Sequence, residues 1–280
     1  MRTHFLALVA ATLLAIGCQT GPFGRKQVVI VSTAQEQRLG ATAYQQVLAE
    51  EKDKVLPGDD ALSRLVAEVG GRLARASESP TFREAAGLTR PQLFEWRFAV
   101  VDEKQVNAFC LPGGKVVVYT GILPSCKSDA GLAVVLGHEI SHALARHGAE
   151  RMTQQQMGNA GVLAAEFGLR RSGLGAESQD GLMRALNAGE KYGLLAYSRR
   201  QESEADRMGL LLMATAGYDP GEAPAFWDRM PTAAGGEGPV YASTHPGHAT
   251  RIADLKRWQA EALPLYRAAD PQPDRVLPKR

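Results

Sequence analysis

The chain has 280 residues, of which 45% are apolar and 22% are charged, and its 32 Lys and Arg nearly balance 30 Asp and Glu. These values are ordinary for a folded protein and exclude wholesale disorder, collagen and a multi-span membrane protein. No long basic run is present, so we expect no nucleic-acid partner. Three cysteines are too few for a disulfide scaffold, and the length allows one or two domains with a substantial core.

Residues 1–17 have the parts of a secretory signal: a short non-acidic start, the apolar run 5–16 and small residues before Cys18. The apolar run is too short to cross a bilayer. The stretch 15–18 (AIGC) resembles the lipobox of bacterial lipoproteins, in which the signal is cut before the cysteine and the cysteine receives lipid. An ordinary cleaved signal with an incidental cysteine is the alternative. We expect a lipoprotein signal peptide at 1–17 and a lipidated tether at 18–32.

The residue after Cys18 is Gln19, where lipoproteins retained at the inner membrane often carry Asp. The resemblance therefore favours the periplasmic face of the outer membrane in a bacterial cell envelope. Lipid at Cys18 is the expected membrane attachment, because no later stretch approaches 18 uncharged apolar residues. Cys110 and Cys126 would remain. They could pair in an oxidising periplasm or stay as two buried free thiols, and the sequence leaves both open.

The elements predicted beyond residue 32 are helices interrupted by a short β-rich part. In chain order we expect helices at 33–51 and 59–76, a proline-broken stretch at 77–92, strands at 94–100, 106–111 and 115–120 with a turn at 112–114, helices at 129–147 and 149–169, a loop at 170–180, helices at 191–215 and 221–230, a loop at 232–238 and a last helix at 249–262. One α+β domain over 33–265, followed by a polar tail at 266–280, accounts for this order.

The segment His138-Glu-Ile-Ser-His142 carries the H-E-x-x-H pattern on a predicted helix. Histidines four residues apart lie on one helix face, so both imidazoles can reach one metal ion. Glu139 would lie close to that metal ion and could accept a proton from a water molecule bound to it. Two surface histidines are the alternative. Apolar neighbours such as Leu136 and Ile140 argue against it, because buried histidines beside a buried glutamate need a partner such as a metal.

A catalytic zinc needs a third protein ligand and an open position. One known pattern has Gly seven and His ten residues after the first histidine, but these positions hold Ala145 and Gly148. His147 comes nine residues after the first histidine and is turned away from the ligand face. We expect it to be a surface or C-terminal-turn histidine that complements the helix dipole.

A second predicted helix offers the third ligand. Glu202 and Asp206 are four residues apart and share a face, whereas Glu204 points elsewhere. We expect Glu202 to bind the metal and Asp206 to hold the second nitrogen of a ligating histidine, which fixes its tautomer. The alternative is an exposed helix whose carboxylates pair with neighbouring arginines, namely Arg199, Arg200 and Arg207.

Together these motifs resemble zinc metallopeptidase family forty-eight, which contains the CaaX prenyl protease and the HtpX membrane protease. The resemblance covers most of 95–260 and also rests on the segments 107–121, 208–209, 216–220, 243–246 and 251–252. The periplasmic lipoprotein subset is the most similar, because the transmembrane helices of the multi-span members are missing. The resemblance implies a mostly helical, gluzincin-type α+β domain with a small β-sheet beside the active-site helix.

The resemblance also implies site roles. One zinc ion per chain would be held by His138, His142 and Glu202, with Glu139 as general base. His245 would approach the metal or the oxyanion, although from the residues alone it is a lone loop histidine. The role of Arg251 stays open between positioning the late loop and stabilising charge.

The expected function is a membrane-anchored zinc endopeptidase that hydrolyses misfolded or unassembled envelope proteins. Zinc makes water a nucleophile at neutral pH, and Glu139 carries the proton. A polypeptide substrate would lie extended along an edge strand near Asn107, Val117 and Tyr119, because strand addition satisfies its backbone without reading its sequence. The outer-membrane assembly machinery is a further expected partner. The alternatives are a non-proteolytic assembly factor that uses the same cleft and a structural-zinc protein with four closed ligands.

Overall fold

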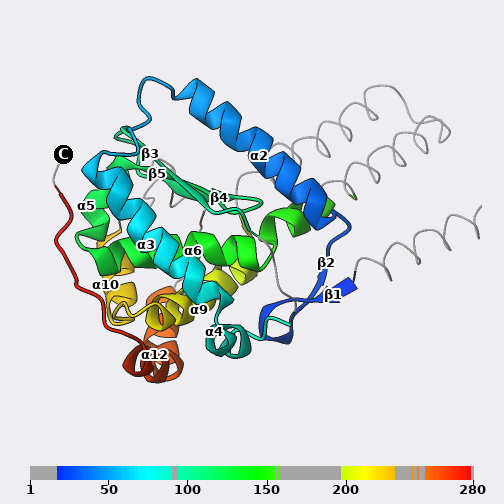
Figure 1. Ribbon diagram of the computed structural model, residues 1–280. Helices are drawn as coiled ribbons and strands as arrows, with labels where there is room; N and C mark the ends of the chain where they lie inside the picture. The colour runs from blue at the N-terminus through cyan, green and yellow to red at the C-terminus, as the bar shows by residue number, and fades with distance from the viewer. Residues whose placement is uncertain are drawn as a thin grey trace, which may run out of the picture.

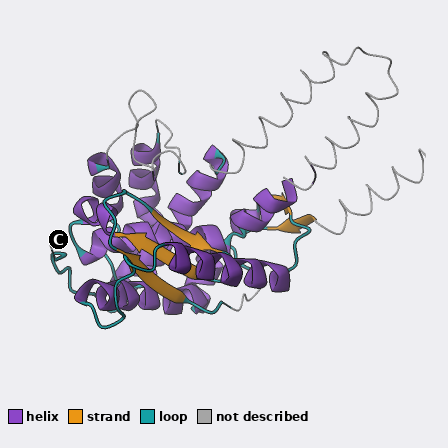
Figure 2. Cartoon of the chain, turned by 90° about the horizontal axis from the view of Figure 1, so that it is seen from above, coloured by secondary structure: helices purple, strands orange, loops and turns teal. Residues whose placement is uncertain are grey.

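The computed structural model describes residues 18–89, 94–154, 157, 197–230, 241, 245 and 250–278. The predicted signal peptide at 1–17, the loops expected at 170–180 and 232–238, and most of the helix expected at 149–169 lie outside these residues. In the described part, helices surround a small central sheet (Figure 2). The expected mostly helical α+β class is therefore confirmed.

A three-stranded sheet with the strand order β3-β5-β4 forms the middle layer. β3 (Arg97–Val101) is parallel to β5 (Lys115–Tyr119), and β4 (Ala108–Leu111) is antiparallel to β5. The predicted turn joins β4 to β5 through Gly113 and Gly114, which have φ values of 78° and 84° that glycine adopts readily. The second and third predicted strands are confirmed, and the first begins at Arg97 rather than at residue 94.

Different helices cover the two faces of the sheet (Figure 1). One face joins the main core beneath α3 (Ala61–Glu78) and α6 (Asp129–Leu144). The other face packs against α2 (Thr33–Glu50) through Tyr44. Successive residues of a strand point to opposite faces, so Val116 and Val118 enter the main core while Val117 and Tyr119 lie on the side of α2. The sheet is thus buried on both sides.

α6 and α9 (Arg199–Thr215) cross at a contact between two glycines. A Cβ atom added to Gly209 would lie 2.9 Å from the backbone nitrogen of His138 and 3.0 Å from the carbonyl carbon of Gly137. The absence of side chains at both positions therefore brings the two backbones together beside the H-E-x-x-H segment. This close approach is what lets side chains of α9 reach the histidines of α6.

The ends of α9 follow local signals. Ser198 caps its N-terminus in a reciprocal capping box with Gln201. The helix therefore begins at Arg199, and residues 197 and 198, which the prediction included in the helix, lie outside it. The chain leaves the helix through Gly217 at φ 86°, as predicted.

Two shorter helical regions complete the domain. α4 (Pro80–Ala85) and α10 (Glu222–Arg229) are brief, and α10 agrees with the prediction. α12 (Arg251–Ala268) continues past the predicted end at 262 and contains Pro264. The helix persists because Leu265 and Tyr266, which follow the proline, pack against the core.

The expected tether at 18–32 is instead folded against the domain. β1 (Cys18–Thr20) pairs antiparallel with β2 (Lys26–Val28), and the 3-10 helix η1 (Pro22–Gly24) joins them. Val29 and Val31 are buried in a small cluster with Ala149. Cys18 is exposed. The tether prediction is wrong for residues 18–31, because every second residue of 27–31 (Gln27, Val29 and Val31) turns toward the domain and is buried.

The C-terminal segment is also docked rather than free, as its path along the outside of the molecule shows (Figure 1). Asp274 accepts a hydrogen bond from the backbone of Ala130 at 2.9 Å, and Arg275 pairs with Asp129 at 2.6 Å. Leu277 is buried. The part of the predicted polar tail around Asp274 therefore closes over the N-terminus of α6, where N–H groups favour its carboxylate.

Cys110 and Cys126 are both buried free thiols, which is the second of the two alternatives. Burial raises the pKa of each thiol and keeps it protonated. Within the described ranges, no helix combines the length and apolar character that crossing a membrane requires.

Candidate metal centre

The crossing of α6 and α9 brings the two H-E-x-x-H histidines and Glu202 together in the core. His138 Nε2 lies 3.1 Å from His142 Nε2 and 3.4 Å from a carboxylate oxygen of Glu202. His142 Nε2 lies 3.3 Å from the other carboxylate oxygen. All three side chains are buried. The structure therefore unites the three residues that the sequence singled out as ligands.

His245 contributes a fourth donor from the segment between α10 and α12. Its Nδ1 atom is 3.2 Å from His138 Nε2 and 3.1 Å from Glu202 Oε1. A backbone hydrogen bond to the carbonyl of Tyr241 helps to hold this segment. One donor atom from each of the four residues lies within 4.8 Å of the other three. The lone loop histidine of the sequence is thus part of the buried cluster.

The donor set fits a zinc ion. Zinc bound by imidazole at about 2.0–2.1 Å in a tetrahedron separates its ligand atoms by about 3.4 Å. The neighbouring donor atoms here are 3.1–3.4 Å apart. Three imidazoles and one carboxylate also suit zinc better than magnesium or calcium, which prefer oxygen ligands.

The charge of the cluster also calls for a cation. Burial alone would raise the pKa of Glu202, but the adjacent imidazoles outweigh burial and hold that pKa well below its usual range. Burial alone would lower the pKa of His138, yet Asp206 and Glu202 outweigh burial and raise it to about 10. The geometry therefore holds a positive charge between the two carboxylates, and a metal ion would supply that charge in place of the proton.

Asp206 and Arg251 support the His138 side of the cluster. Asp206 Oδ1 lies 2.9 Å from His138 Nδ1, as expected for the residue that orients a ligating histidine. Arg251 binds Asp206 and Glu202, each at 2.7 Å, and stacks over Trp227 at 3.7 Å from the ring centre. Of the two roles left open for Arg251, these contacts favour the stabilisation of charge, because its guanidinium pairs with both carboxylates directly. The alternative of an exposed, arginine-paired helix is wrong, because both carboxylates are buried.

His147 contradicts its prediction as a surface residue. It is fully buried, with Nδ1 2.9 Å from His142 Nδ1 and Nε2 3.0 Å from Glu204 Oε2. Burial lowers the pKa of the His147 ring. The prediction extended α6 to residue 147, but α6 ends at Leu144 and Arg146 adopts φ 58°. This left-handed residue turns the chain and directs His147 back to the cluster.

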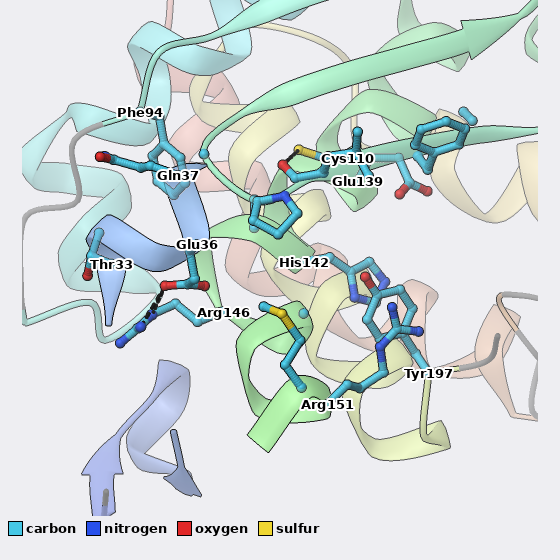
Figure 3. Close-up of a pocket in the computed structure, with 18 of the residues that line it drawn as sticks. Thr33, Glu36, Gln37, Phe94, Cys110, Glu139, His142, Arg146, Arg151 and Tyr197 are labelled. Carbon is cyan, nitrogen blue, oxygen red and sulfur yellow. Dashed lines mark hydrogen bonds and ion pairs between the residues drawn. The ribbon is translucent and has the colours of Figure 1, made fainter. Parts of the chain in front are cut away.

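Glu139 lines a cavity of about 370 Å³ that opens from the cluster toward α2 (Figure 3). His142 and His245 lie at the same end of the cavity, and Tyr197 stacks on His142 with 3.8 Å between ring centres. Glu139 Oε1 is 3.5 Å from His245 Nε2. A carboxylate, the candidate metal ligands and an open cavity thus meet at one place.

The cavity runs along β4, the strand at this edge of the sheet, and Asn107 lines it as expected. Val117 and Tyr119 do not, because β5 is the central strand and pairs on both sides. The edge-strand position expected for these two residues is therefore wrong. The hydrogen bond from Tyr119 N to Asn107 O sets the antiparallel alternation, which turns the N–H and C=O groups of Ala108 and Cys110 away from β5.

A paired-histidine helix, a carboxylate from a crossing helix and a neighbouring glutamate at the end of a cavity define the domain of a metallopeptidase. Residues 71–259 match peptidase family M48, and the chain belongs to this family. The motif-based family prediction is therefore confirmed.

Relatives of the chain carry peptidase names. It is 36% identical over 240 residues to the mitochondrial metalloendopeptidase OMA1 of Schizosaccharomyces pombe, covering 85% of this chain and 65% of that protein. It is 41% identical over 174 residues to mitochondrial metalloendopeptidase OMA1 of Arabidopsis thaliana, covering 61% and 34%. A putative beta-barrel assembly-enhancing protease of Vibrio cholerae is 27% identical over 272 residues, covering 94% and 53%. The chain thus spans about a third to two thirds of these relatives.

Proposed function

We propose that the chain is a zinc-dependent endopeptidase with one zinc ion held by His138, His142 and Glu202. The observation that supports this most directly is the position of Glu139, which lines the cavity beside the four-donor cluster. When bound, zinc supplies a Lewis acid that polarises the scissile carbonyl and activates water. A structural-zinc site would have no need of a second buried carboxylate facing a cavity.

The chain's own residues have separate tasks in this proposal. Glu139 takes the proton from the attacking water and delivers it to the leaving nitrogen. Asp206 Oδ1, 2.9 Å from His138 Nδ1, would keep the ring proton on Nδ1, so that the lone pair of Nε2 faces the other donors. His245 closes the cluster as a fourth donor in this conformation. Because a catalytic zinc needs one open position, His245 would not be a permanent ligand in this proposal.

The substrate is a polypeptide that lies extended along β4. Ala108 and Cys110 offer outward-facing backbone groups beside the cavity, and Asn107 stands at the start of the strand. Strand addition satisfies the substrate backbone without reading its side chains. We therefore expect broad sequence specificity, limited by which chains can reach the cavity in an extended form.

The test is Glu139→Gln in the purified protein. Casein cleavage is expected to fall by at least about 100-fold, because general base catalysis contributes that much or more. Metal analysis should still find one zinc per chain, since Glu139 is not among the proposed ligands. A chelated wild-type sample serves as the control for metal dependence. Undiminished cleavage by the variant would reject the assigned base.

For location we propose the periplasmic face of a bacterial outer membrane, with lipid on Cys18. The signal-like pattern of 1–17 and the exposed position of Cys18 support this. The substrates would be misfolded or unassembled envelope proteins. Relatives in Vibrio cholerae and Escherichia coli are named beta-barrel assembly-enhancing proteases, whereas others are named mitochondrial. Cys18→Ala should abolish labelling by a fatty acid and release the protein from membranes.

A second candidate function is a non-proteolytic assembly factor for outer-membrane proteins that uses the same cavity. The names of the Vibrio cholerae and Escherichia coli relatives favour considering it. The two functions separate in one experiment. If Glu139→Gln complements a deletion strain as well as the wild type does, the holding function is sufficient. If complementation is lost with zinc still bound, hydrolysis is required.

A further inference from the structure

The two proposed imidazole ligands are supported differently at their second nitrogens. His138 Nδ1 faces the carboxylate of Asp206 directly at 2.9 Å. His142 Nδ1 faces another imidazole, His147 Nδ1, at 2.9 Å, and the far nitrogen of His147 lies 3.0 Å from Glu204 Oε2. Each of these second nitrogens is thus linked to a carboxylate of α9. We call the contacts from His142 through His147 to Glu204 the second path, because here the ring of His147 lies between the proposed ligand and the carboxylate.

The direction of each hydrogen bond on the second path follows from its end. The carboxylate of Glu204 can only accept, so the proton of His147 is on Nε2. A neutral imidazole carries a single proton, so His147 Nδ1 is then an acceptor and the proton between the two rings belongs to His142 Nδ1. This leaves the lone pair of His142 on Nε2, which is the atom that faces His138 and Glu202. The path therefore fixes the tautomer that metal binding requires.

Glu204 is in turn held by a residue far away in the sequence. Arg25 Nε lies 2.5 Å from Glu204 Oε2, and the two terminal nitrogens of Arg25 bind Glu150 at 2.8 and 3.0 Å. Gln201 donates to the same Glu150 at 2.8 Å. The side chain of Arg25 is only 10% exposed. An arginine held in this fork has little freedom to release Glu204.

We infer that His147, Glu204 and Arg25 are positioning residues for the metal centre, so the folded segment at 18–31 is part of that centre. The inference rests on the proposed function, because it assumes that His142 binds zinc. It gives the segment directly after the predicted lipidation site a specific task. Arg25 holds Glu204, Glu204 orients His147, and His147 orients His142.

The first test measures zinc affinity by competition with a chelator in the mature chain. His147→Leu fills the space with an apolar side chain of similar size but removes both hydrogen bonds. It should weaken zinc binding by about 10–100-fold. His147→Gln can accept from His142 and donate to Glu204, so it should recover most of the affinity. Cobalt substitution supplies a second readout, because its visible absorption reports ligand geometry. The Leu variant should change this spectrum and the Gln variant should not.

A matched pair of arginine variants separates positioning from simple docking of the N-terminal segment. Arg146 also anchors this segment, through Val31 O at 2.8 Å and Gln19 Oε1 at 3.2 Å, and pairs with Glu36. Among the described residues, the hydrogen bonds of its side chain go to Glu36, Gln19 and Val31 and not to Glu204, His147 or His142. Arg25→Met should weaken zinc binding by about 10-fold or more, whereas Arg146→Met should change it by less than about threefold.

The outcomes distinguish this inference from the proposed function. If the wild type binds no zinc, both fail. If the wild type binds one zinc but His147→Leu matches its affinity and cobalt spectrum, the positioning inference alone is overturned. Equal zinc affinities for the Arg25 and Arg146 variants would also overturn it. Should the Leu variant fail to fold, the arginine pair still decides.

Discussion

The two sides of the candidate metal centre meet the same chemical requirement by different means. On the His138 side, the supporting carboxylate Asp206 is four residues from Glu202 on the same helix, and Arg251 binds both. On the His142 side, support comes through His147 to Glu204, and the arginine that completes it lies 179 positions away in the chain.

If His138 and His142 bind zinc as proposed, the comparison indicates two ways to place a carboxylate behind a ligand: directly, as Asp206 does for His138, or through a second imidazole, as Glu204 does through His147 for His142. The local version depends on helix spacing alone, because residues four apart share a face. The relay from His142 through His147 to Glu204 depends on the left-handed turn at Arg146 after α6. It also depends on the folding of the N-terminal segment 18–31, which carries Arg25. We therefore expect the relay side to be the more sensitive to events in the N-terminal segment.

The largest effect is expected from Glu202→Ala, which removes the donor shared by both sides. Zinc affinity should fall by more than the roughly 100-fold that outer partners reach, and the Arg251 guanidinium would lose one of its two buried partners. Chelator competition measures the effect. Glu261→Ala, at a partly exposed pair with Arg207, is the control and should bind zinc normally. Retention of affinity within tenfold would exclude Glu202 as a ligand.

The next effect compares the two carboxylates directly. Asp206→Asn should lower zinc affinity by about 10–100-fold, because it weakens the direct acceptor of His138. Glu204→Gln should lower it less, since the inserted ring of His147 remains. Both variants are measured by the same competition assay. A larger loss with Glu204→Gln would reverse the ranking of the two sides.

A smaller effect, on stability, is expected at the crossing of α6 and α9, the two helices that carry the candidate ligands His138, His142 and Glu202. Gly209→Ala places a Cβ 2.9 Å from the backbone of His138 and must push α9 away from α6. Unfolding of the zinc-free protein in urea should show a loss of about 1–3 kcal/mol. Gly71→Ala is the control, because its Cβ would meet only Arg75 at 3.6 Å, and it should be neutral or stabilising.

The smallest effect concerns pH and the two arginines that hold the N-terminal segment. Burial would raise the pKa of Glu150, but Arg25 and Gln201 outweigh it and lower that pKa below 4.5. Burial dominates at Glu36 and raises its pKa above 4.5 in spite of Arg146. Glu150 therefore adds stability above its unfolded pKa and loses it as pH falls, while Glu36 behaves in the opposite way.

Urea unfolding of the zinc-free protein at pH 7 and about pH 4 checks these signs. Glu150→Gln should cost more stability at neutral pH than in acid. Glu36→Gln should cost less at neutral pH than in acid, because the wild-type carboxyl is favoured in its protonated form. Parallel behaviour of the two variants would show that the two arginine contacts are equivalent.

Much of the site could be predicted from spacing within single elements. The pairs His138/His142 and Glu202/Asp206 are each four residues apart on a helix, and this alone places each pair on one face. The strands around the turn at 112–114 followed from alternation and from glycines that permit positive φ. Such features depend on the periodicity of the backbone, which a sequence states directly.

Other residues could not be placed by these rules. His147 was predicted away from the ligands because helical periodicity was extended through Arg146. The sequence around Arg146 contains no pattern that predicts its left-handed φ. Val117 and Tyr119 were assigned to an edge strand, but strand order depends on pairing between distant segments. The capping box at Ser198 was a readable signal and would have given the correct start of α9.

Residue identity and helical spacing alone indicated two helices that each present candidate metal ligands on one face, a glutamate beside them, and membership in a metallopeptidase family. Only the folded chain shows which outer groups contact these candidate ligands. Arg25, His147 and His245 come from segments without regular spacing relative to the helices, so only the packed chain defines their distances to the cluster. Long-range contacts of this kind are set by the burial of charge and by the close crossing of two helices at glycine, neither of which has a local pattern.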